Sequence, residues 1–98
     1  MTKALLTVLL AGSSSCAVTG ARYDQIMTEK VGKQAAFDLQ CPREQVSVTK
    51  IDQASFGATG CGKRASYVGT DRRCDPIQDE STLVNRCTMV PGTPVTNL

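Results

Sequence analysis

The chain has 98 residues, a net charge of +2, no histidine and only 4% aromatic residues. This length suits one small domain, whose core normally needs covalent staples or partners. The near-neutral charge excludes a strongly basic nucleic-acid-binding domain, and the lack of histidine excludes His-based catalysis and imidazole metal ligands. Five cysteines are a high count and indicate an oxidising compartment.

Residues 1–15 have the character of an export signal. A single Lys3 precedes the apolar residues 4–12, a stretch about half as long as the roughly 20 residues that span a bilayer. A secretory segment therefore fits better than a membrane-spanning helix. Three serines then lead to Cys16, a pattern that resembles the lipobox of bacterial lipoproteins. The pattern departs from that family at Ser13, where an aliphatic residue is preferred.

The lipobox resemblance implies that the signal is cut before Cys16 and that this thiol carries a diacylglycerol. Two alternatives are a secretory signal cut near Ala17 and a buried first strand of a cytosolic protein. Cysteine parity favours lipidation, because the remaining four cysteines can form two disulfides. The family further implies an envelope location, and Ala17 in place of Asp after the cysteine favours the outer membrane over the inner.

Residues 16–21 are small and predict a short tether, after which residues 22–39 have a helical pattern. Met27, Val31 and Ala35 recur every four residues, and Phe37 and Leu39 are expected to complete the packed face. A break is expected at Gly32, which weakens a helix by about 1 kcal/mol relative to Ala.

After Pro42 the pattern changes to that of strands. Residues 45–51 predict one strand, and residues 56–67 predict a returning strand with a glycine-rich bulge at residues 60–62. Residues 83–90 predict a third strand, and residues 91–98, which contain two prolines, predict a flexible tail. The expected fold is therefore α+β, with one helix packed on about three antiparallel strands in a domain of residues 22–90.

Two further sequence elements extend the resemblance to lipoproteins beyond the signal segment. The sequence FDLQCP at residues 37–42 and GCGKRASYV at residues 60–68 resemble a family of small lipoproteins of myxobacteria and related bacteria. The similarity covers about residues 33–70. It implies a small disulfide-containing α+β domain on a lipid tether and no defined activity.

The motif GATGCGK at residues 57–63 matches the start of a nucleotide-binding phosphate loop. The next residue is Arg64, whereas such loops need Ser or Thr there to hold Mg²⁺. The segment is also expected to join strand to strand, so no nucleotide and no cofactor is expected.

Other chemical sites have little support in the sequence. The four later cysteines are too widely spaced for a typical zinc site, so no metal is expected. Asp71, Asp75, Asp79 and Glu80 lie in a polar stretch that is typical of a solvated loop. The basic pairs at residues 63–64 and 72–73 are expected to be solvated, although either could touch anionic headgroups near the tether. No catalytic residue is assigned.

Four cysteines allow three disulfide pairings, and the sequence does not decide among them. We favour Cys41–Cys61, which would tie the helix end to the returning strand, with Cys74–Cys87, which would close a polar loop. The expected function is a non-enzymatic, lipid-anchored envelope protein that acts as a structural or interaction module for an unknown envelope partner. The alternative is a freely secreted, disulfide-stabilised inhibitor or effector.

Overall fold

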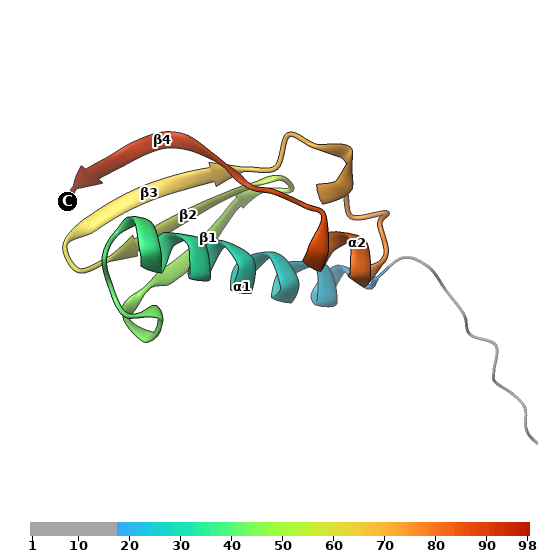
Figure 1. Ribbon diagram of the computed structural model, residues 1–98, viewed down its shortest axis with the longest axis horizontal. Coiled ribbons are helices and arrows are strands. Elements are labelled where there is room, and N and C mark those ends of the chain that lie inside the picture. Colours follow the sequence, from blue (N-terminus) through green and yellow to red (C-terminus); the bar gives the residue numbers. More distant parts are fainter. Residues whose placement is uncertain (1–17) are drawn as a thin grey trace, which may run out of the picture.

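The computed structural model describes residues 18–98, which form one long helix packed on a four-stranded antiparallel sheet (Figure 1). The elements in chain order are α1 (Gly20–Asp38), β1 (Ser47–Asp52), β2 (Ser55–Gly60), β3 (Lys63–Val68), α2 (Glu80–Asn85) and β4 (Val90–Asn97). Short 3₁₀ turns lie at Arg43–Gln45 and Arg72–Cys74. The α+β prediction is confirmed, with one strand more than expected.

Helix α1 begins at Gly20, two residues earlier than predicted. The hydroxyl of Thr19 accepts a hydrogen bond from the Arg22 amide at 3.1 Å and so caps one of the unpaired donors of the first turn. The predicted tether is therefore too long, because residues 20 and 21 are helical and residue 19 is the cap. The signal, Cys16 and Ala17 lie outside the described residues.

The end of α1 is a turn that reverses the chain toward the sheet. Gln40 takes a left-handed φ of 53°, and the Cys41 amide donates to the Ala36 carbonyl at 3.0 Å. A second bond runs from the Gln40 amide to the Phe37 carbonyl at 3.2 Å. This pair of bonds defines a Schellman motif, in which glycine usually occupies the position of Gln40.

The expected break at Gly32 does not occur, and α1 is continuous. Gly32 is buried, and a Cβ at this position would overlap the guanidinium group of Arg43. Arg43 donates to the Val46 carbonyl at 3.1 Å and lies 3.6 Å from the carboxylate of Glu29. The glycine therefore makes room for an arginine that returns from the 3₁₀ turn to the helix.

The segment predicted as one bulged strand is two strands joined by a tight turn. Cys61 and Gly62 have φ values of 53° and 77°, and Gly60 pairs with Lys63 across the turn. Two successive left-handed residues form the turn type that matches the twist of a two-residue hairpin. Residues 60–62 are therefore a hairpin connection rather than a bulge, which is why the sheet has an additional strand.

The C-terminal part of the fold also differs from the prediction. Residues 80–85 form α2 instead of a strand, because Asp79 caps a helical turn and Leu83 packs into the core. Residues 90–97 form β4, which pairs with β3 as an edge strand, so the predicted tail at 91–98 is wrong. Pro91 and Pro94 are compatible with this place, because an edge strand leaves one side of its backbone unpaired.

The core lies between α1 and the inner face of the sheet, and α2 closes one end (Figure 1). The largest fully buried side chains are those of Tyr67, Phe56, Met27, Leu39, Leu83, Val31 and Cys74. Phe37 was expected in this core, but 83% of its surface is exposed. It lies two positions from Ala35 and so falls on the opposite side of α1.

Candidate functional site

The two favoured disulfides are present in the structure. Cys41 bonds to Cys61 across 20 residues of sequence, and Cys74 bonds to Cys87 across 13. The first bond ties the end of α1 to the β2–β3 turn, as predicted. The second closes the segment that contains α2, also as predicted. Cys16, the fifth cysteine, lies outside the described residues.

The first disulfide lies where three backbone segments come very close. A Cβ on Gly60 would lie 2.9 Å from the Gln45 carbonyl oxygen and 3.1 Å from the Cys41 sulfur. A second link between the end of α1 and the sheet is the hydrogen bond that the Tyr67 hydroxyl donates to the Asp38 carboxylate at 2.6 Å. Burial raises the pKa of this tyrosine, and the bond to Asp38 raises it further. These contacts fix the end of α1 on the sheet.

The second disulfide is buried against the start of α1. Cys74 and Cys87 are 2% and 3% exposed. The Tyr23 hydroxyl donates to the Cys74 carbonyl at 2.8 Å and lies 3.2 Å from the Gln53 carbonyl. Burial raises the pKa of Tyr23, and the charges of Asp75 and Asp24 add to this effect. One phenol thus links α1, the β1–β2 turn and the disulfide segment.

Three of the four acidic residues of this segment have structural partners. Asp71 accepts from the Arg73 amide at 3.0 Å, and Asp79 accepts from the Thr82 amide at 3.2 Å. Glu80 forms an ion pair with Arg22 that joins α2 to α1. Hydrogen bonds from Thr82 and from Arg22 lower the pKa values of Asp79 and Glu80, respectively, so both remain ionised. Their observed contacts are those of helix caps and a surface ion pair.

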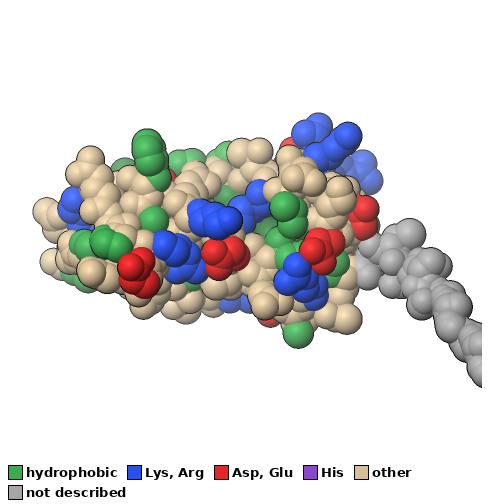
Figure 2. Space-filling model, turned by 60° about the horizontal axis from the view of Figure 1, so that its bottom comes forward, with side chains coloured by type: hydrophobic (Ala, Val, Ile, Leu, Met, Phe, Trp, Pro, Cys, Tyr) green, Lys and Arg blue, Asp and Glu red, His purple; other side chains and the backbone are tan. Residues whose placement is uncertain are grey.

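The two basic pairs lie at opposite ends of the molecule. Residues 63–64 begin β3 beside the hairpin turn, whereas residues 72–73 belong to the turn that Tyr23 holds against the first turn of α1. Figure 2 shows basic side chains gathered at the end where α1 starts, while basic and acidic groups alternate along the rest of that face. The motif at residues 57–63 runs from β2 into a hairpin, so it does not join a strand to a helix.

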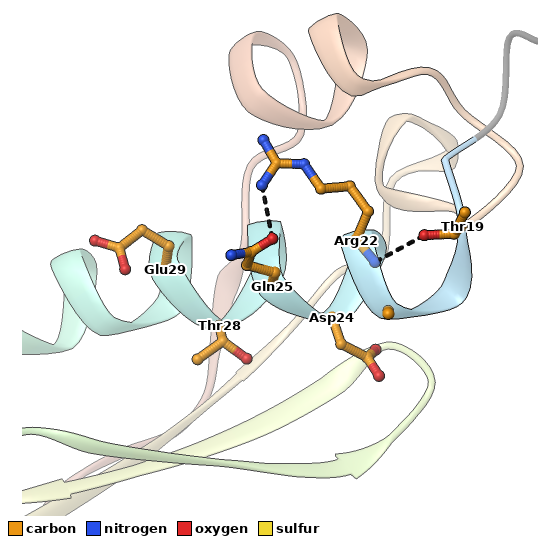
Figure 3. A pocket seen from close by; sticks show the side chains of 7 residues that line it. Thr19, Arg22, Asp24, Gln25, Thr28 and Glu29 are labelled. Carbon is orange, nitrogen blue, oxygen red and sulfur yellow. Dashed lines mark hydrogen bonds between the residues drawn. The ribbon is translucent and has the colours of Figure 1, made fainter.

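The side chains that line a hollow on the first turns of α1 do not converge on a common point. Figure 3 shows Arg22 and Gln25 on one side of the helix, joined by a 2.8 Å hydrogen bond, and Asp24 and Thr28 on the other. The side chains of these two pairs point away from one another. The hollow is therefore an open stretch of helix surface.

A second groove, of about 410 Å³, runs between α1 and α2. Its lining has three basic side chains, one acidic, one amide and two apolar: Arg22, Lys30, Lys33, Glu29, Gln25, Ile26 and Val84. Lys30 donates to the Val84 carbonyl at 3.0 Å, and burial together with the charge of Lys33 lowers its pKa. These residues were not singled out from the sequence. The signal was the spacing of Lys30, Lys33 and Phe37 by three and four positions, which places them on one side of a helix.

In residues 18–98, no group of three or more cysteine or carboxylate side chains is placed to hold a metal ion. Within the same residues, no helix has the length and apolar character needed to cross a membrane. The chain matches no family model, and no curated protein or solved structure is detectably similar to it.

Proposed function

We propose that this chain is an envelope lipoprotein whose lipid is carried by Cys16, and whose folded domain is a non-enzymatic structural or interaction module. The observation that carries the proposal is the pairing of the other four cysteines. Two disulfides use Cys41, Cys61, Cys74 and Cys87, and the fifth cysteine follows three serines at the end of an apolar segment. Disulfides of this kind form in exported proteins.

The start of α1 supports the same proposal. Only Ala17 and Val18 separate Cys16 from the Thr19 cap, so a lipid on Cys16 would hold the domain close to the membrane surface. The family of small myxobacterial-type lipoproteins that the sequence resembles implies the same arrangement, a small domain on a short lipid tether. An outer-membrane location is part of the proposal, because Ala17 follows the cysteine.

A freely secreted inhibitor or effector is the second candidate, since the same two disulfides would stabilise a secreted domain equally well. The two candidates differ at Cys16. Mass spectrometry of the mature N-terminus, with labelling by radioactive palmitate, tests them directly. The lipoprotein begins at Cys16 with added acyl mass, whereas the secreted protein begins elsewhere and carries no acyl chain.

The variant Cys16→Ser tests whether labelling and membrane association depend on this cysteine. We expect this variant to lose palmitate labelling. We also expect it to move from the membrane fraction to the soluble fraction. Cys61→Ser is the matched control, because it also replaces one cysteine with serine but keeps Cys16, so labelling should remain intact. Wild-type protein that incorporates no fatty acid would refute the lipoprotein proposal.

A further inference from the structure

One face of α1 carries basic and apolar side chains that are exposed or only partly covered by the rest of residues 18–98. We name this face the lysine strip and define it as Lys30, Lys33, Phe37 and the neighbouring Val84 of α2. The three helical residues are spaced by three and four positions, so they share one side of α1. Phe37 is 83% exposed and Val84 is 47% exposed, and Phe37 is the most exposed large apolar side chain described.

The strip carries positive charge that is not neutralised locally. Lys33 forms no ion pair with any residue of 18–98, and Lys30 bonds to a backbone carbonyl instead of a carboxylate. The nearest acidic side chain in the groove, Glu29, already faces Arg43 at 3.6 Å. An anionic surface would therefore complement the strip.

The short connection to Cys16 suggests what that surface is. Three residues of chain reach at most about 10 Å, whereas the 19 residues of α1 extend about 28 Å. With the lipid in the bilayer, the first turn of α1 must stay close to the headgroups. The far end is close to them only when the helix lies along the membrane.

We propose that α1 lies flat on an anionic bilayer, with the lysine strip against the headgroups and Phe37 at the interface. This inference rests on the lipid anchor proposed above. The acyl chains on Cys16 hold the protein at the bilayer, and basic residues near an anionic surface add an attraction that can fix its orientation. One phenylalanine and one valine are too little apolar surface for a stable protein interface, which buries more than about 1,000 Å².

The absence of tryptophan from the sequence allows a direct test. Phe37→Trp places a unique fluorophore in the strip, and Val95→Trp places one on the exposed edge strand β4 as a control. Each mature protein is inserted into phosphatidylcholine vesicles with or without phosphatidylglycerol, after mass spectrometry has verified acylation at Cys16. Quenching by brominated lipid and by aqueous acrylamide is then measured.

In anionic vesicles, we expect the tryptophan of the F37W variant to be quenched by brominated lipid and shielded from acrylamide. The tryptophan of the V95W variant should remain accessible to acrylamide. High salt and Lys33→Gln should both weaken the shielding in F37W, the latter by about fivefold in the membrane-facing population. Arg64→Gln, on β3 and outside the strip, removes the same charge and should change nothing.

The outcomes separate the two proposals. If the acylated F37W variant is as accessible to acrylamide as the V95W variant, the flat orientation is wrong and the lipoprotein proposal stands. If Cys16 carries no lipid, both fall. Crosslinking of the strip to an envelope protein, with the tryptophan of F37W exposed to water on pure lipid, would also overturn the membrane proposal.

Discussion

The two disulfides stabilise different kinds of structure. Cys41–Cys61 joins two regular elements that already have packing of their own, the end of α1 and the β2–β3 hairpin. Cys74–Cys87 closes a segment in which α2 has six residues and only Leu83 is buried. A ring of either size contributes about 3 kcal/mol by loop entropy. The burial and packing around each bond, rather than the size of its ring, should therefore decide which disulfide contributes more to stability.

The largest effect is expected from Cys74→Ala combined with Cys87→Ala. Both sulfurs are buried, so this change removes core contacts as well as the ring. We expect a loss of about 4–5 kcal/mol, which is comparable to the whole stability of a domain of this size. Urea unfolding measures the loss, and amide exchange should show residues 70–89 opening first.

Cys41→Ala combined with Cys61→Ala should lower the free energy of unfolding by less, about 3 kcal/mol. The segment around α2 should keep its exchange protection, because its own disulfide and Tyr23 remain. Cys61→Gly in place of Cys61→Ala should recover about 1 kcal/mol, since residue 61 is left-handed. A loss equal to that of the buried disulfide would contradict the comparison.

A tyrosine hydrogen bond at each end of α1 sharpens the comparison. Tyr23→Phe and Tyr67→Phe should each cost about 1–2 kcal/mol, because each leaves a part-buried or buried acceptor without its donor. We expect Tyr23→Phe to increase exchange mainly in residues 70–89 and Tyr67→Phe mainly at the end of α1. An identical exchange pattern in both variants would show that the two ends do not open separately.

The same tyrosines predict sensitivity to alkali. Their pKa values in the folded protein lie above the unfolded value of about 10. Their contribution to stability is therefore complete below that pH and is lost as the pH rises toward the folded values. Thermal melts between pH 8 and 11 should show this loss, and Tyr67→Phe should reduce it. Melting temperatures that do not change over this range would contradict the prediction.

The smallest effect is expected at the end of α1. Gln40→Gly should stabilise the domain by about 0.5 kcal/mol, because the left-handed conformation costs an ordinary residue about 1–2 kcal/mol and the greater freedom of unfolded glycine offsets part of the gain. Urea unfolding in the wild-type and the Cys41/Cys61-free backgrounds should give the same gain. Gln40→Ala is the control and should not stabilise.

The sequence predicted the parts of the fold that follow from periodicity. The four-residue spacing of Met27, Val31 and Ala35 located α1, and the alternation after Pro42 located β1. The same spacing places Phe37 outside the buried row, so the prediction that Phe37 completes the packed face was wrong. The disulfide pairing was favoured because Cys41 follows the predicted helix and Cys61 lies on the predicted returning strand, so that one bond would tie the two together.

The remaining elements depend on contacts that periodicity does not show. Turns of the type at residues 61–62 usually begin with Asn, Asp or Gly, so Cys61 gave no turn signal, and a disulfide holds it there. Helix α2 is too short to show a helical repeat, and Asp79 before Glu80 was its one local sign. Strand β4 has two prolines and no buried residue, so only its pairing with β3 makes it a strand.

The disulfides join cysteines that are consecutive among the four of the folded domain, Cys41 to Cys61 and then Cys74 to Cys87. A chain that is exported from its N-terminus presents these thiols to an oxidase in that order. With the Cys16 thiol acylated, as proposed, an enzyme that couples each new cysteine to the last free one would produce the native pairs directly. Maturation of this domain should require a thiol oxidase but no disulfide isomerase.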